Sequence, residues 1–213
     1  MNKLCVENLT KKMKDMTILR SVHLEMQSNE IYGLVGKNGS GKTMLIRSIA
    51  GLMKPTEGTI KWNDSQLYRD IDFIPKLGVV IENINLYPEF TGFQNLMFLS
   101  KINKICTKED IQNAIARVGL DPNDKRVIRK YSLGMRQKIA LAQAIMEKPD
   151  ILLLDEPTNA LDEASTINIR EIIKEEAQRG AIVLIASHNQ EDIQSLCNTI
   201  YYMQDGTLQL SGE

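Results

Sequence analysis

Apolar residues in this chain gather in short unbroken runs, which are separated by longer segments with a helical pattern. Four such runs, at 31–35, 77–81, 151–154 and 182–185, have the length of strands. A strand that is apolar along its whole length is buried on both faces, which is typical of a parallel sheet covered by helices. The pattern therefore predicts an α/β architecture with a mostly parallel sheet.

Other segments alternate apolar and polar residues, as a strand with one solvent-exposed face does. Residues 22–26 follow this alternation, and His23 falls on a polar position, so we expect this histidine in solvent rather than in a functional site. A further strand is predicted at 59–62. The segment 201–208 has the pattern of a β-hairpin that turns at an Asp-Gly pair.

Between residues 91 and 147 the sequence is predominantly helical. Thr107 and Ser132 each stand directly before a helical pattern, and each has the hydroxyl that a helix N-cap uses. No internal repeat or low-complexity segment interrupts the sequence. We therefore expect a single domain, 1–213, in which a helical insert at 84–147 interrupts an α/β core formed by 1–83 and 148–213.

A glycine-rich loop joins the first apolar run to a short helix at 44–51. Strand, glycine loop and helix in this order are the context of a phosphate-binding loop, because the backbone N–H groups and the helix N-terminus converge on an anion. Lys42 adds a full positive charge, and the hydroxyl of Thr43 is suited to a magnesium ion. The sequence therefore predicts a nucleoside triphosphate site at Gly36, Lys37, Asn38, Gly39, Ser40, Gly41, Lys42 and Thr43.

Polar residues follow two further apolar runs at the same edge of the predicted sheet, since the carboxyl ends of parallel strands lie together. Asp155 is placed to hold the magnesium ion beside Thr43. Glu156 would polarise a water in line with the γ-phosphate, and His188 would hold that water or the phosphate. Each of these residues alone is more often a helix cap or a surface residue, but their coincidence downstream of a phosphate loop favours the functional interpretation.

Composition limits the partners that we expect. Lysine and arginine number 26 against 27 aspartate and glutamate, and only 5% of residues are aromatic, which argues against nucleic acid as the main partner. The three cysteines have no metal-binding spacing and fit a reducing cytosol. The apolar run at 181–186 is the longest and is far shorter than the roughly 20 residues that span a bilayer. At a membrane, another chain would have to supply the spans.

Five motifs in a fixed order resemble the nucleotide-binding domain of ATP-binding cassette (ABC) transporters, and the resemblance extends over essentially the full chain. The phosphate loop is similar to the Walker A motif of that family, and 151–157 to its Walker B motif. Residues 131–137 resemble the signature motif, 159–162 the D-loop, and His188 the switch histidine. The branch that exports bacitracin or gives immunity to lantibiotics is the most similar. The resemblance implies a P-loop NTPase core with a mostly parallel sheet, an antiparallel β subdomain and a helical insert.

The resemblance also implies roles for further residues. Met13 stands where the family has an aromatic residue against adenine, and Glu82 stands where it has a glutamine near the metal and the γ-phosphate. Asp162 belongs to the D-loop, in which Ala160 replaces a glycine. The signature motif would cover ATP held by a second subunit; its residues are Ser132, Leu133 (which replaces a glycine), Gly134 and Met135.

The function implied is that of an ATP-hydrolysing subunit that uses ATP and Mg²⁺ to power a membrane transporter. Its expected partners are an integral-membrane permease and a second ABC ATPase subunit, identical or not, and its expected location is the inner face of the cell membrane. The apolar side chains in 86–93 would contact the permease or pack inside the insert. The alternatives are a non-transport ABC-type ATPase and a small-molecule kinase; free phosphate as the product would exclude the kinase. The cargo and the direction of transport stay open.

Overall fold

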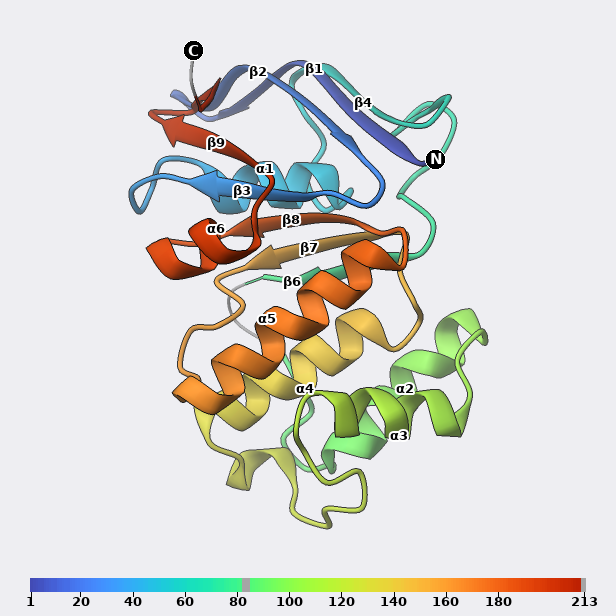
Figure 1. Cartoon of the computed structure of the whole chain (residues 1–213). Helices are drawn as coiled ribbons and strands as arrows, with labels where there is room; N and C mark the ends of the chain where they lie inside the picture. The colour runs from blue at the N-terminus through green and yellow to red at the C-terminus, as the bar shows by residue number, and fades with distance from the viewer. Residues whose placement is uncertain (82–84, 212–213) are drawn as a thin grey trace.

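The computed structural model describes residues 1–81 and 85–211. Its larger sheet has six strands in the order β10-β9-β3-β8-β7-β6 (Figure 1). All neighbours in this sheet are parallel except the hairpin of β9 and β10, which are antiparallel. The predicted α/β class is confirmed. The strands are β3 (Ile31–Val35), β6 (Leu77–Val80), β7 (Ile151–Asp155), β8 (Ile182–Ala186), β9 (Thr199–Gln204) and β10 (Thr207–Leu210).

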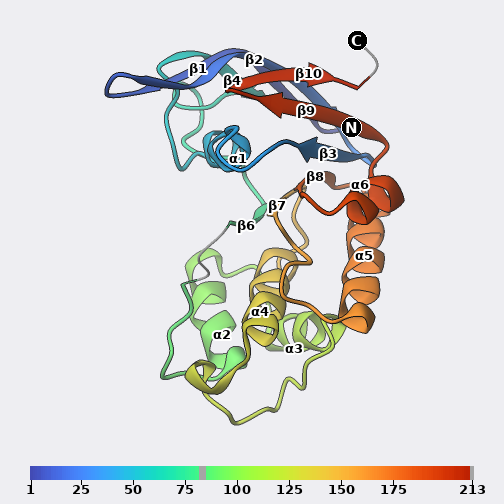
Figure 2. The ribbon, with the colours of Figure 1, turned by 90° about the vertical axis from the view of Figure 1, so that its left-hand side faces the viewer.

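A second, antiparallel sheet of four strands lies over one face of the first, with α1 (Lys42–Ile49) between them (Figures 1 and 2). The expected alternation appears in β2, where Leu24 is buried and His23 is exposed. Helix α1 begins two residues earlier than the sequence predicts, directly after Gly41. The strands of this sheet are β1 (Lys3–Met13), β2 (Met16–Gln27), β4 (Glu57–Trp62) and β5 (Ser65–Gln66).

The other helices lie on the opposite side of the larger sheet (Figure 1). Thr107 and Ser132 are N-caps, as predicted: the Thr107 hydroxyl accepts the N–H of Asp110, and the Ser132 hydroxyl accepts that of Met135. The helices on this side are α2 (Gly92–Asn103), α3 (Lys108–Arg117), α4 (Leu133–Ile145), α5 (Glu163–Gln178) and α6 (Gln190–Leu196), with a 3₁₀ turn at Ile128–Lys130.

Two apolar cores hold these layers together. One lies between the two sheets and includes Leu45 and Ile49 of α1. The other lies between the larger sheet and the helices, and α4 contributes Ile139 and Ile145 to it. Helix α4 packs on both α3 and β6, so it joins the helical segment to the sheet. Because the contact between α4 and β6 crosses the predicted boundary at 84, the packing does not separate the insert from the core, and the division of the chain at 84 and 147 stays a prediction.

Candidate functional site

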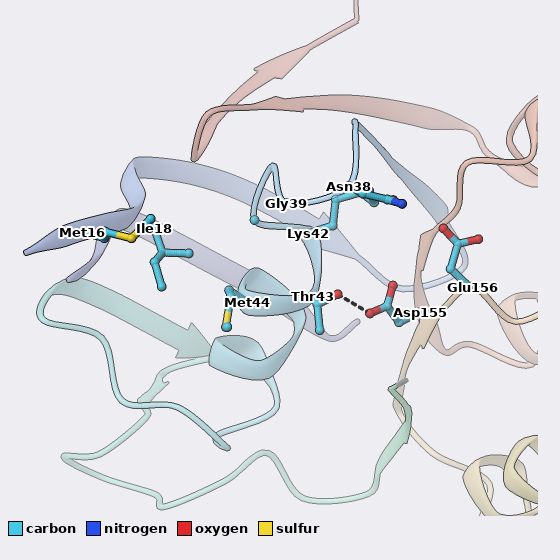
Figure 3. Close-up of a pocket in the computed structure, with 10 residues that line it drawn as sticks. Met16, Ile18, Asn38, Gly39, Lys42, Thr43, Met44, Asp155 and Glu156 are labelled. Carbon is cyan, nitrogen blue, oxygen red and sulfur yellow. Dashed lines mark hydrogen bonds between the residues drawn. The ribbon is translucent and has the colours of Figure 1, made fainter. Parts of the chain in front are cut away.

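A cavity of about 490 Å³ opens where β3 and β7 end and α1 begins (Figure 3). The phosphate loop forms one wall of it, the end of β7 forms another, and the start of β2 forms a third. The residues that line it are Met16, Ile18, Asn38, Gly39, Gly41, Lys42, Thr43, Met44, Asp155 and Glu156.

The phosphate loop takes its shape from close backbone approaches that only glycine permits. A Cβ on Gly36 would lie 2.3 Å from the carbonyl oxygen of Met203, and Gly41 has a φ of 113° at the N-cap of α1. The loop is also tied to the hairpin of β9 and β10, because the N–H of Gly206 donates to the carbonyl oxygen of Ser40 at 3.0 Å. These contacts fix the backbone that faces the cavity.

The ammonium group of Lys42 lies over this loop. Its Nζ donates to the carbonyl oxygens of Gly36, at 2.6 Å, and Lys37, at 3.3 Å. The residue is only 6% exposed, so the cation is held at the wall of the cavity by backbone oxygens. A charge held in this way is available to the phosphate groups of a nucleotide at little cost in side-chain entropy.

Thr43 and Asp155 meet at the floor of the cavity. The Thr43 hydroxyl donates to Oδ2 of Asp155 at 2.6 Å, and Asp155 is almost fully buried (Figure 3). One hydroxyl and one carboxylate are the hard oxygen ligands that Mg²⁺ prefers, and they leave its other positions to phosphate and water. These donors therefore fit the expected ion. The third predicted ligand, Glu82, lies outside the described residues.

Glu156 and His188 form a pair beside Thr43 and Asp155, the residues that would bind the magnesium ion. The Nδ1 atom of His188 lies 2.8 Å from Oε1 of Glu156, and the backbone N–H of His188 donates to the same oxygen at 3.2 Å. Glu156 lines the cavity (Figure 3), whereas the His188 side chain is 67% exposed and is not among the residues that line it. The hydroxyl of Ser187 approaches Oε2 of Glu156 at 3.4 Å. The structure thus brings together the carboxylate and the histidine that the sequence places at separate strand ends.

The signature residues lie outside this cavity, at the exposed start of α4. Leu133 is 62% exposed, and Gly134 packs so closely on the D-loop that a Cβ there would lie 2.8 Å from the carbonyl oxygen of Ala160. Gln137, one turn further, donates through Nε2 to the carbonyl oxygens of Glu156 and Pro157, each at 3.3 Å. The start of α4 is therefore tied to the loop that carries Glu156.

Asp162 and Met13 also lie away from the cavity lining. Asp162 is the N-cap of α5, and its Oδ1 accepts the N–H of Ser165 at 2.8 Å. Met13 is the last residue of β1, opposite Met16 in the hairpin. The side chains that line the cavity next to the loop belong to Met16 and Ile18, which the sequence interpretation missed. They stand two residues apart at the start of β2, and nothing in the local sequence marks them as part of the site.

The fold and the site define a phosphate-loop ATPase. A family model described as ABC transporter matches residues 19–159, and the chain belongs to this family. It is 49% identical to the ABC transporter ATP-binding protein YybJ of Bacillus subtilis, over 97% of this chain and 94% of that protein. It is 35% identical to the bacitracin transport ATP-binding protein BcrA of Enterococcus faecalis over 95% of this chain, and it spans 66% of BcrA. The lantibiotic transport ATP-binding protein SrtF of Streptococcus pyogenes is 30% identical over 98% of this chain and 90% of SrtF.

Solved structures agree with this assignment. The dimeric structure of MJ0796, a bacterial ABC transporter cassette, superimposes with a TM-score of 0.85 at 26% identity, over 97% of this chain and 96% of that one. A post-hydrolysis dimer of the same cassette with ADP and Pi gives a TM-score of 0.82 at the same identity and coverage. The chain is thus an ATP-binding, ATP-hydrolysing subunit of the ABC transporter family, and the expected resemblance to the bacitracin and lantibiotic branch is confirmed. Among the residues that the structure describes, no helix is long and apolar enough to cross a membrane.

Proposed function

We propose that Glu156 is the general base of this ATPase and that Thr43 and Asp155 hold a magnesium ion beside it. The observation that carries the proposal is the 2.6 Å contact between Thr43 and Asp155 on the floor of the cavity that Glu156 also lines. A magnesium ion there would neutralise charge on the β- and γ-phosphates. Glu82, by its position in the sequence, is proposed as a further ligand close to the γ-phosphate.

Each remaining residue of the site has a proposed task. The loop from Gly36 to Gly41 binds the phosphates through backbone N–H groups, and Lys42 binds them through its charge. Glu156 accepts a proton from a water aligned with the γ-phosphate, which activates the water for attack. His188, held against Glu156 by two hydrogen-bonding contacts, orients the carboxylate and meets the γ-phosphate at the rim of the cavity.

A second ATPase subunit is proposed to complete the site. The first turn of α4 has backbone N–H groups without partners within the helix, and such groups bind anions. Ser132 and Leu133 expose this helix start to solvent. ATP held by Lys42 of one subunit would then lie against Ser132 to Met135 of the other, with Asp162 and its D-loop beside them. Binding of ATP to the closed pair alone would shift the subunits towards association.

The membrane partner is proposed to be a permease that contacts the exposed aromatic side chains near α2. Phe90 and Phe98 pack edge to face with their ring centroids 4.8 Å apart, and Tyr87 lies 6.1 Å from Phe90. Tyr87 and Phe90 are exposed, whereas Phe93 packs against the core. Through such a contact the subunit would sit at the inner face of the cell membrane, and by similarity to BcrA and SrtF the cargo would be a peptide antibiotic. Similarity to transport proteins does not favour the alternative of a non-transport ATPase.

Replacing Glu156 by Gln tests the proposal directly. The variant keeps the size of the side chain but removes the base, so the release of free phosphate should fall by about 10²- to 10⁴-fold while ATP binding is retained. Gel filtration with ATP should then show an accumulated dimer. The control is Glu163→Gln, which changes an exposed glutamate of α5 and should hydrolyse ATP normally. Normal hydrolysis by Glu156→Gln would show that another group is the base.

A further inference from the structure

A buried carboxylate lies behind the catalytic pair. Asp192, in α6, has no solvent exposure. Its Oδ1 accepts a hydrogen bond from Nε of Arg170 at 2.8 Å, and its Oδ2 accepts the hydroxyl of Thr158 at 2.5 Å and that of Ser187 at 3.3 Å. Thr158 follows the end of β7, and Ser187 follows the end of β8. One carboxylate therefore holds both loops that carry the proposed catalytic residues.

Ser187 connects this carboxylate to Glu156. Its hydroxyl oxygen lies 3.3 Å from Oδ2 of Asp192 and 3.4 Å from Oε2 of Glu156, and it accepts the N–H of Asn189 at 3.0 Å. A hydroxyl has a single proton, so it can donate to only one of the two carboxylates at a time. Ser187 itself is fully buried.

The arrangement is costly unless all its members are present. A buried charge that loses its partner is strongly destabilising, whereas an apolar group of the same shape often stabilises a protein as well as a buried ion pair does. What the cluster around Asp192 adds is a fixed geometry: Thr158 is two residues from Glu156, and Ser187 precedes His188. Through these two hydroxyls, Asp192 contacts both loops.

We propose that Asp192 is a positioning residue for ATP hydrolysis, which sets the Glu156 carboxylate and the His188 backbone through the hydroxyls of Thr158 and Ser187. The inference rests on the proposed role of Glu156 as the base. Asp192 itself does not line the nucleotide cavity, whose walls come from other residues. Its loss is therefore expected to slow the chemical step without weakening the binding of ATP.

The hydroxyl of Thr158 offers the cleanest test, because it can be removed without changing any charge. In Thr158→Val the turnover number of the full chain, measured as phosphate release with Mg²⁺ and ATP, should fall roughly tenfold while KM for ATP stays within about twofold. Ser187→Ala should act in the same direction. Thr158→Ser keeps the hydroxyl and should restore turnover, which a loss of packing volume alone would not predict.

A second buried carboxylate supplies the matched control. Glu176, in the last turn of α5, is also buried and accepts hydrogen bonds from Arg117 and Arg179, at 2.8 and 2.9 Å, but no hydrogen bond links its side chain to either loop. Asp192→Asn and Glu176→Gln should both lower the melting temperature, and only Asp192→Asn should lower the turnover number. If Asp192→Asn does not fold, comparing Thr158→Val with Thr158→Ser still shows whether the hydroxyl that binds Asp192 is needed for turnover.

The outcomes separate this inference from the proposal on which it rests. Normal hydrolysis by Glu156→Gln would overturn the role of the base and, with it, the positioning role. An inactive Glu156→Gln together with normal turnover in Thr158→Val would overturn only the positioning role of Asp192. An equal loss of turnover in Glu176→Gln and Asp192→Asn would do the same, because it would trace the effect to stability alone.

Discussion

The two ends of the nucleotide cavity are built in different ways. At the phosphate end, Lys42 and Asp155 are buried, and they stand where core elements begin or end. At the opposite end, Met16 and Ile18 belong to the hairpin of β1 and β2, and Met16 is 72% exposed. One end offers charges and backbone dipoles held in place by the fold. The other offers a small apolar surface that is mostly in solvent.

The difference indicates how binding energy is divided between the parts of a nucleotide. Charge-assisted hydrogen bonds in a water-poor site are strong and depend on exact placement. A thioether against a base is a weaker and more adaptable contact. We therefore expect affinity to come mainly from the phosphates, and the choice between adenine and guanine to be loose. The following changes test this division from the strongest effect to the weakest.

Replacing Lys42 by Ala should have the largest effect, because it removes the buried charge at the phosphate end. A hydrogen bond to a charged group contributes about 1.5–3 kcal/mol, so ATP affinity should fall on the order of a hundredfold. Titration calorimetry with Mg²⁺ and ATP measures this loss. Lys125→Ala, which removes an exposed lysine that does not line the cavity, is the control for surface charge. Equal losses in the two variants would contradict the division.

Gly206 joins the two ends, and its replacement by Ala should have an intermediate effect. The N–H of Gly206 donates to the Ser40 carbonyl oxygen, and a Cβ on Gly206 would lie 2.3 Å from the carbonyl oxygen of Ile18. The clash would push the hairpin turn away from both ends, and ATP affinity should fall roughly tenfold. Gly119→Ala is the matched control: its φ of 75° resembles the 81° of Gly206, but its nearest neighbour is Nζ of Lys138 at 3.8 Å. Both variants should lose stability from the backbone strain, Gly206→Ala more so because of its clash with Ile18, and only Gly206→Ala should lose affinity.

Met16→Ala should have a smaller effect, limited to the end of the cavity formed by Met16 and Ile18, where we expect the base (the base end). Loss of the thioether contact should lower ATP affinity about threefold and leave the preference for ATP over GTP, which we expect to be small, almost unchanged. Met13→Ala removes the same side chain from the facing strand of the hairpin, where it does not line the cavity. If Met13→Ala lowered affinity more than Met16→Ala, the base would lie against the residue that the sequence alone predicts.

The last prediction changes no residue: the reactivity of the Cys197 thiol depends on how tightly this side chain is packed against β3. Burial, with a smaller contribution from the charge of Asp192, raises the pKa of the Cys197 thiol to about 12. The reactive thiolate is therefore scarce below that pH and increases about tenfold with each pH unit towards it. Burial also raises the pKa of Cys5 and of Cys106. A thiol reagent at pH 8 should modify Cys197 last, and mass spectrometry of the labelled protein would show any other order.

The phosphate end could be predicted from the sequence, because its residues follow directly from chain order. Asp155 and Glu156 come straight after an apolar strand, and His188 comes two residues after another. Parallel strands bring such residues to one edge whatever the details of the packing. The phosphate loop can be identified from the spacing of its own residues alone. The structure accordingly places Thr43 against Asp155, and Glu156 against His188.

The base end and the cluster around Asp192 could not be predicted in this way. The hairpin of β1 and β2 turns at Lys14, whose φ is 51°, without the Asn-Gly or Asp-Gly pair that marks such a turn, so the register that brings Met16 to the cavity leaves no local signal. Asp192 lies in a seven-residue helix with too few turns to show a buried face. Its partners Thr158 and Arg170 are 34 and 22 residues away, and only the folded chain brings them together.

The two carbonyl oxygens that accept the side chain of Gln137 have a consequence for a pair of these subunits. Gln137 lies one turn inside α4, and its side-chain amide donates hydrogen bonds to the backbone of Glu156 and Pro157. If the ATP of a neighbouring subunit moved the start of α4 on binding there, the same movement would pull on the loop that carries this subunit's own proposed base. The two ATP sites of the pair would then be coupled, because binding or hydrolysis at one site would shift the loop that carries the proposed base of the other.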